Sequence, residues 1–125
     1  MKINIDIQPQ GNYLLVRYRG PDSLEISRNI MQQIVGACDE YECFNILVLA
    51  YIENLLSTLE NYDLAAMFTE VGFSSKHRMA WVDQNPDTYD STYFAETILH
   101  NRGFSARLFR EVGDAKQWLL SDTTD

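Results

Sequence analysis

The sequence predicts an α/β domain built on a mixed, mainly parallel five-stranded sheet. The first observation is a long apolar segment, residues 44–52, whose branched and aromatic side chains are typical of a strand buried on both faces. The second is that amphipathic segments with helical periodicity precede and follow it. The third is a strict alternation of apolar and polar residues over 2–8, followed at 13–19 by a second segment in which Leu14, Val16 and Tyr18 share one face; both predict strands.

Length and composition favour one domain. The chain has 125 residues, of which 46% are hydrophobic and 22% charged, and a chain of this size can bury a core without staples. We expect the domain to span residues 1–121 and the polar residues 122–125 to form a disordered tail.

The first two strands are expected to form an antiparallel hairpin. Pro9 and Gly11 lie between them and mark a turn. In the second strand, Leu14, Val16 and Tyr18 share one face, and the opposite face carries Tyr13, Leu15, Arg17 and Arg19. This clean alternation predicts that helices leave part of one sheet face uncovered.

The first helix follows Gly20 and Pro21, which end the second strand. Either Asp22 or Ser23 supplies its N-cap. An apolar stripe at helical spacing continues to about residues 38–41. The buried strand at 44–52 comes next.

The second helix begins with a capping-box pattern, Ser57 and Glu60, and Gly72 is placed to end it. A strand is expected at 79–83, after the basic stretch around His77, which we interpret as a solvated turn.

The last part of the chain predicts a helix at about 90–101, a strand at about 105–110 and a final helix capped by Asp114. Gly103 is placed to end the third helix. The predicted order is therefore ββαβαβαβα, with the helices mostly on one face of the sheet.

Three segments carry a resemblance to a known family: 78–83 (RMAWVD), 101–109 (NRGFSARLF) and 115–119 (AKQWL). With the order of elements, they make the chain resemble, over about residues 2–120, the SpoIIAA-like family of small bacterial proteins. These share a fold with STAS domains, the anti-sigma-factor antagonists, and more distantly with CRAL-TRIO lipid carriers. The antagonists carry an Asp-Ser-Ser/Thr-Gly type motif after the central strand, and no residues here match it; Ser57 and Thr58 only fall near the same helix start.

Charge and motif content exclude several classes of function. The net charge of −8 opposes binding to nucleic acid and to anionic lipid surfaces. No signal peptide and no apolar run of about 20 residues is present, so we expect a soluble, cytoplasmic protein. Cys38 and Cys43 are expected to be reduced thiols.

We expect no metal, no cofactor and no catalytic residue. The two histidines lie far apart, without metal-ligand spacing. The stretch that begins at Asp83 starts like a calcium loop, but Thr88 and Phe94 occupy the positions that need Gly and Glu.

Three sets of residues are candidates for function. Ser57 and Thr58 form a possible regulatory helix start, where a phosphate would be favoured by free N–H groups; the alternative is that Ser57 is simply an N-cap. A ligand pocket between helices and sheet would be lined by Tyr51, Leu55, Leu56 and Phe68. An apolar, arginine-rimmed interface, for a partner or for a homodimer, would contain Tyr13, Leu15, Arg17, Arg19, Arg107 and Phe109. The alternative to this interface is a monomer with scattered surface aromatics.

The function that the sequence favours is a non-enzymatic binding or regulatory module acting through protein–protein interaction. The alternative, which the CRAL-TRIO similarity implies, is a carrier or sensor of a small apolar, lipid-like ligand, and it requires a cavity of several hundred Å³. A small hydrolase or isomerase ranks last, because no reactive constellation is present.

Overall fold

The strands of the computed structural model form one five-stranded sheet in the order β1-β2-β3-β4-β5. The structure describes residues 5–121. The first pair of strands is antiparallel and the other three pairs are parallel. The strands are β1 (Ile5–Pro9), β2 (Leu14–Gly20), β3 (Asn45–Ile52), β4 (Arg78–Asp83) and β5 (Ser105–Phe109). The predicted fold class and element order are confirmed, whereas the predictions for residues 2–4 and for the tail at 122–125 lie outside the described residues.

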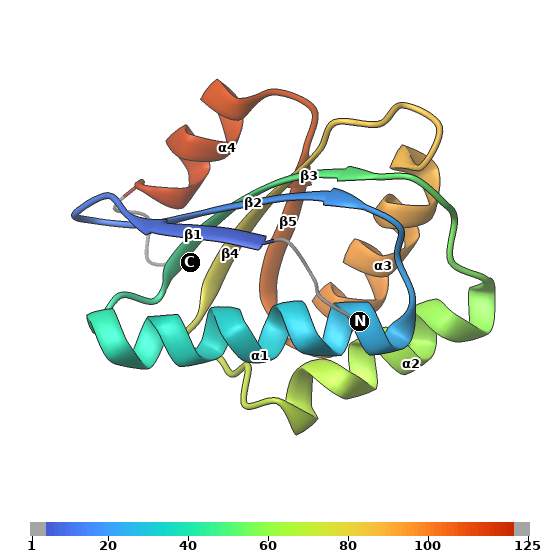
Figure 1. The fold of residues 1–125 in the computed structure, drawn as a ribbon, viewed down its shortest axis with the longest axis horizontal. Coiled ribbons are helices and arrows are strands. Elements are labelled where there is room, and N and C mark those ends of the chain that lie inside the picture. Colours follow the sequence, from blue (N-terminus) through green and yellow to red (C-terminus); the bar gives the residue numbers. More distant parts are fainter. Residues whose placement is uncertain (1–4, 122–125) are drawn as a thin grey trace.

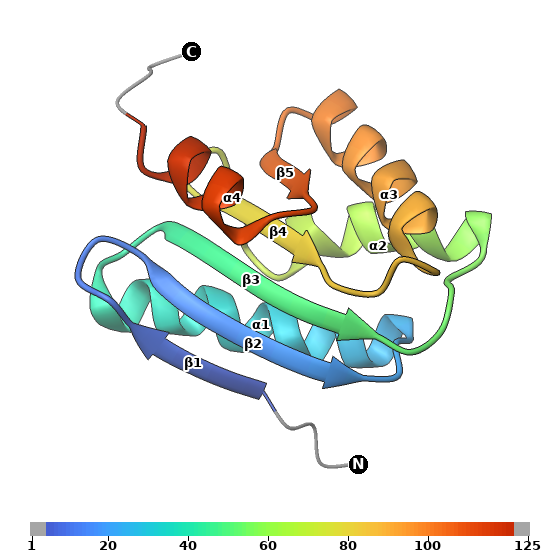
Figure 2. The ribbon, with the colours of Figure 1, turned by 90° about the horizontal axis from the view of Figure 1, so that it is seen from above.

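Helices cover the two faces of the sheet unequally (Figures 1 and 2). The helices are α1 (Leu24–Tyr41), α2 (Thr58–Glu70), α3 (Tyr89–Asn101) and α4 (Val112–Leu119). Figure 1 shows α1 and α2 below the strands and α4 above them. One core packs against α1, α2 and α3, and a second, smaller core packs under α4, so the predicted placement of helices mostly on one face is confirmed.

Strand register assigns each side chain to one of these cores. Val16, Val48 and Trp81 align across three strands and face α1 and α2. The neighbouring row, Leu15, Leu47 and Ala80, faces α4. Because successive side chains point to opposite faces, this register decides which residues of every strand are open to a partner.

Local signals explain the ends of α1, α2 and α3. Ser23, the second of the two predicted candidates, caps α1 through a bond from the Ile26 N–H to its Oγ (3.1 Å). Gly72 and Gly103 adopt φ +94° and +86°, the left-handed conformation that ends a helix readily only at glycine. The backbone N–H of Phe104, the residue after Gly103, donates to the Leu99 carbonyl at the end of α3 (3.1 Å).

The start of α4 differs from the sequence prediction. The helix begins at Val112 with Glu111 at the N-cap, and Asp114 lies in the first turn instead of capping it. The dipole still favours a carboxylate there, so the acidic residue suits the helix start without forming the cap bond.

Candidate functional site

The carboxyl ends of β2 and β3 are joined by a side-chain clamp from Asn54. Its Oδ1 accepts the Asp22 N–H (2.7 Å) and its Nδ2 donates to the Asp22 carbonyl (3.0 Å). The Glu53 N–H also donates to the Gly20 carbonyl (2.9 Å). These bonds hold the loop before α2 against the loop before α1. Open α/β sheets place ligands beyond the carboxyl ends of their strands, which makes this edge the candidate site.

Ser57 forms the capping box that its spacing predicts. Its Oγ accepts the Glu60 N–H (3.1 Å), and the Glu60 carboxylate accepts the Ser57 N–H (2.9 Å). Thr58, the first residue of α2, is exposed. The Ser57 hydroxyl is therefore already engaged in holding the helix start, whereas the neighbouring Thr58 side chain faces solvent.

Three large apolar side chains are exposed within eight residues around this helix start. Leu55 is 61% exposed, Leu59 76% and Tyr62 47%. Leu59 and Tyr62 are three residues apart in α2, so they share a side of the helix. The Tyr62 ring also packs edge-on against Phe94 of α3, with ring centroids 5.7 Å apart. We call Leu55, Leu59 and Tyr62 the apolar ridge.

The surroundings of the apolar ridge are acidic. Residues 53–70 contain Glu53, Glu60, Asp63 and Glu70 and no lysine or arginine. The only ion pair found within residues 5–121 joins Glu70, at the far end of α2, to Arg28 (2.7 Å). The start of α2 therefore presents apolar side chains in a negatively charged setting.

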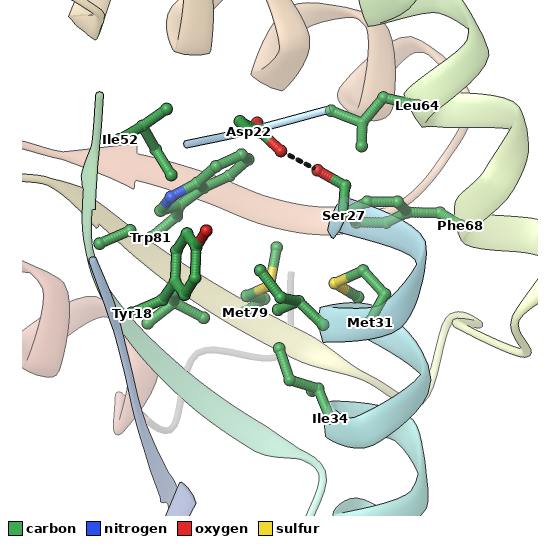
Figure 3. Close-up of a pocket in the computed structure, with 13 residues that line it drawn as sticks. Tyr18, Asp22, Ser27, Met31, Ile34, Ile52, Leu64, Phe68, Met79 and Trp81 are labelled. Atoms are coloured by element: carbon green, nitrogen blue, oxygen red, sulfur yellow. Dashed lines mark hydrogen bonds between the residues drawn. The ribbon is translucent and has the colours of Figure 1, made fainter. Parts of the chain in front are cut away.

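A cavity lies beneath this edge, between α1, α2 and the sheet (Figure 3). Apolar side chains from the sheet and both helices line most of it, among them Trp81, Met31 and Phe68. Its volume is about 50 Å³. Pockets for small organic ligands are roughly 300–1,000 Å³, so the carrier interpretation receives no support from this cavity.

Polar groups at the rim of the cavity are engaged locally. The Asp22 carboxylate accepts the Ser27 hydroxyl (2.6 Å) and the Ser23 N–H (2.8 Å), as Figure 3 shows for Ser27. Burial raises the pKa of Asp22, and the Ser27 and Ser23 hydrogen bonds oppose this rise. Burial also raises the pKa of Tyr18, and the nearby carboxylates add to the effect. Within the described residues, the Trp81 indole N–H is buried without a partner.

The four residues predicted to line a ligand pocket do not line one cavity. Phe68 lines the cavity described above, whereas Leu55 and Leu56 border a smaller recess of about 20 Å³ nearby. Tyr51 lies on the opposite face of the sheet, in a groove with Arg19. The reason is strand alternation: Ala50 and Ile52 face the helices, so Tyr51 between them faces away.

The six residues predicted as an interface share one sheet face, but α4 divides them. Tyr13, Leu15 and Phe109 pack against the small core under α4. Arg107 lies on β5, in a groove with Trp118 and residues of α3. Arg17 and Arg19 remain on the open part of the face.

The interpretation of the stretch around His77 as a solvated turn is wrong, because the His77 side chain is buried. It is 1% exposed, its ring stacks on Phe73 (centroids 4.9 Å apart), and Phe44 packs edge-on at 5.4 Å. Its Nδ1 accepts the Ser74 N–H (3.0 Å). Burial lowers its pKa, and the charge of Lys76 acts in the same direction.

The stretch that begins at Asp83 and resembles the start of a calcium-binding loop forms hydrogen bonds within the loop before α3. The buried Asp83 carboxylate accepts the Asn85 N–H (3.0 Å) and the hydroxyls of Thr88 (2.9 Å) and Thr92 (2.7 Å). Both carboxylate oxygens of Asp83 are therefore occupied by hydrogen bonds that stabilise this loop. Across residues 5–121, no group of three His, Cys, Asp or Glu side chains is placed to hold a metal ion.

Leu59 and Tyr62 are not among the residues predicted from the sequence, although helical spacing in α2 marks Leu59 as exposed. The buried residues of α2 include Phe68, and Leu59, nine residues earlier, lies about 180° around the helix from it. A leucine opposite the buried stripe is exposed unless a partner covers it.

No helix within the described part of the chain is long and apolar enough to cross a membrane.

Comparison with known proteins establishes the fold. No family model matches this chain, and no match is found among curated proteins. A search of solved structures finds the "Crystal Structure of an Anti-sigma Factor Antagonist from Mycobacterium paratuberculosis", with a TM-score of 0.63 over 96% of each chain and 16% sequence identity. The fold is therefore that of the anti-sigma-factor antagonists, as the resemblance implied.

Proposed function

We propose that this chain is a non-enzymatic regulatory module that acts by binding another protein, in the manner of an anti-sigma factor antagonist. The observation that carries the proposal is the apolar ridge, Leu55, Leu59 and Tyr62, exposed at the start of α2. The similarity in fold to a structure titled as an anti-sigma factor antagonist supports the same class of function. A bacterial, cytoplasmic setting belongs to the same proposal.

The chemistry of the apolar ridge indicates what its partner should offer. Apolar and aromatic side chains form the centres of protein interfaces, where burial removes them from water. The ridge lies beside Glu53, Glu60 and Asp63 and has no basic residue near it in sequence. The expected partner surface is an apolar recess with basic residues at its rim, since opposite charges favour encounter and discriminate against wrong partners.

Titration calorimetry against purified anti-sigma factors of the source organism tests the proposal. Replacing Leu55 and Leu59 together by Gln should weaken binding by at least about tenfold, because the variant removes apolar area from the interface centre. The matched control is Leu120→Gln, which changes an exposed leucine just after α4, remote from the ridge. An unchanged Kd for the double variant, or binding by none of the anti-sigma factors, would contradict the proposal.

Regulation through Ser57 or Thr58 is part of the proposal. A phosphate on Ser57 would displace the capping-box contact with Glu60 and add negative charge beside the apolar ridge. Ser57→Asp should therefore weaken partner binding, whereas Ser57→Asn, an equally good but uncharged N-cap, should not. Thr58→Asp tests the exposed neighbour in the same way. Equal affinities for the Asp and Asn variants would remove the regulatory role of the helix start.

A further inference from the structure

A groove of about 430 Å³ lies on the open part of the sheet face that carries α4. It is formed by β2, β3 and the residue after β4, and Figure 2 shows these strands beside α4 without a helix above their carboxyl ends. The residues that matter are Arg17, Arg19, Leu49, Tyr51 and Gln84. We call this the arginine groove. It lies on the other side of the sheet from α2 and the apolar ridge.

In the part of the chain that the structure describes, the guanidinium groups of Arg17 and Arg19 have no carboxylate partner. Within residues 5–121, no Asp or Glu lies within ion-pair distance of Arg17 or Arg19. Asp6 aligns with Arg17 across β1 and β2, but its carboxylate accepts the Gln8 side-chain amide instead (3.0 Å). Arg19 stacks over the Tyr51 ring at 4.3 Å. Within residues 5–121 Arg28 is the one basic residue with an ion pair, so the groove is distinguished by its two arginines lying two residues apart on one exposed strand face.

The spacing of the groove residues matches an extended ligand. Arg17 and Arg19 are two residues apart on one strand, which places their Cα atoms roughly 6.6 Å apart on the same face. Leu49 and Tyr51 align beside them on β3 and supply an apolar floor. An extended peptide repeats its side chains at the same interval, whereas residues two apart in a helix point in different directions.

We propose that the arginine groove binds an extended acidic segment of a partner protein, with carboxylates at alternate positions paired to Arg17 and Arg19. The guanidinium fork matches a carboxylate with two parallel hydrogen bonds, and the side chain between two carboxylates points away from the sheet. This surface goes beyond the proposed function, because its face, its charge and its partner differ from those of the apolar ridge. The module would then hold two partners at once.

The test uses two fluorescein-labelled peptides of equal composition. In one, three Glu residues alternate with two Val residues between Gly-Ser ends; in the other, the three Glu residues are adjacent. Fluorescence anisotropy should show the wild-type protein binding the alternating peptide at least about fivefold more tightly, and raising the salt from about 50 to about 300 mM should weaken binding.

Arg17→Glu and Arg102→Glu form a matched pair, because both reverse one exposed arginine and give the same net charge. Only Arg17→Glu should weaken binding of the alternating peptide, by about tenfold or more. Circular dichroism on both variants checks that each is folded. Equal loss in the two variants, no preference between the peptides, or no binding at all would overturn the proposal.

Two further measurements separate this inference from the alternatives. The first is analytical ultracentrifugation of the wild type and of Arg17→Glu. A wild-type dimer that becomes a monomer in Arg17→Glu would place a second copy of the chain in the groove and overturn the acidic-segment proposal. The Leu55 and Leu59 double variant should bind the alternating peptide as the wild type does. If no anti-sigma factor binds, the peptide experiment still tests the arginine groove. If the peptides do not bind, the calorimetry still tests the proposed function.

Discussion

The two faces of the sheet are covered to different extents, and the difference locates the candidate binding surfaces. Within the described residues, the core under α1, α2 and α3 contains 21 buried side chains, whereas the core under α4 contains five. The first face is closed, so the surface it offers comes from its helices, as in the apolar ridge. The second face is partly open, so the strands themselves present side chains, as in the arginine groove.

The width of a single helix accounts for the open part of this face. α4 runs roughly along β3 and β4 (Figure 2), and a helix is only about 10–12 Å across with its side chains. Five strands spaced by roughly 4.8 Å form a sheet about 19 Å wide. One helix packed on β3 and β4 cannot cover that width, so the β2 side of the face stays in contact with solvent.

The largest expected effect is the loss of stability when a buried side chain is truncated, and it should differ between the two cores. Phe68→Ala, in the large core, should lower the free energy of unfolding by about 3–5 kcal/mol, because a large ring leaves a cavity among residues that cannot collapse into it. Leu119→Ala, under α4, should lower it by about 2–3 kcal/mol, the low end for leucine, because one edge of that core is open. Both residues are nearly fully buried, Phe68 at 1% and Leu119 at 2% exposure. Urea unfolding measures both losses.

Amide exchange sharpens the same comparison. Leu119→Ala should speed exchange mainly in α4, because α4 makes its main contacts with that small core. Phe68→Ala should speed exchange across α1, α2 and the strands. Uniform acceleration in both variants would show that the two faces unfold as one unit and would break the comparison.

A smaller effect is expected from the contact that anchors α4. The Arg78 guanidinium lies 3.8 Å from the centre of the Trp118 ring and donates to the Trp118 carbonyl (2.8 Å). Arg78→Met keeps the aliphatic stem and removes both interactions, so stability should fall by about 1–3 kcal/mol. Arg107→Met is the control, because Arg107 is exposed and 5.5 Å from the Phe109 ring. Equal, small losses in urea unfolding would show that Arg78 does not anchor α4.

The smallest effect is a pH dependence from His77, on the helix-covered side. Its pKa is lowered in the folded state from the ordinary value of 6.5, so the unfolded chain takes up the proton first. Stability is therefore complete above about pH 6.5 and falls as the pH drops below it. Urea unfolding at about pH 7.5 and 5.5 should show a smaller loss in His77→Gln than in the wild type.

His100→Gln is the control for His77, because His100 is exposed in the last turn of α3. It should lose stability between the two pH values as the wild type does. A wild-type response in His77→Gln would show that other groups cause the acid sensitivity.

Some features of the candidate site are predictable from the sequence and others are not. The capping box of Ser57 and Glu60 is predictable, because that contact spans only one helical turn. The placement of Tyr51 in one pocket with Phe68 was avoidable, since Tyr51 alternates with Ala50 and Ile52, which face α1 and α2. Leu59 was also accessible through helical spacing. His77 was not, because its burial depends on Phe73 and Phe44, and no local pattern marks that packing.

The sequence by itself determined the elements, their order and the two faces of each strand. Periodicity, caps and turns act over a few residues, so they are written locally in the chain. Only the tertiary structure decided that α4 covers β3 and β4, that Arg78 anchors a helix 40 residues away, and that Arg17 and Arg19 stay open. These outcomes depend on how whole elements pack together, and that packing is settled between segments distant in sequence.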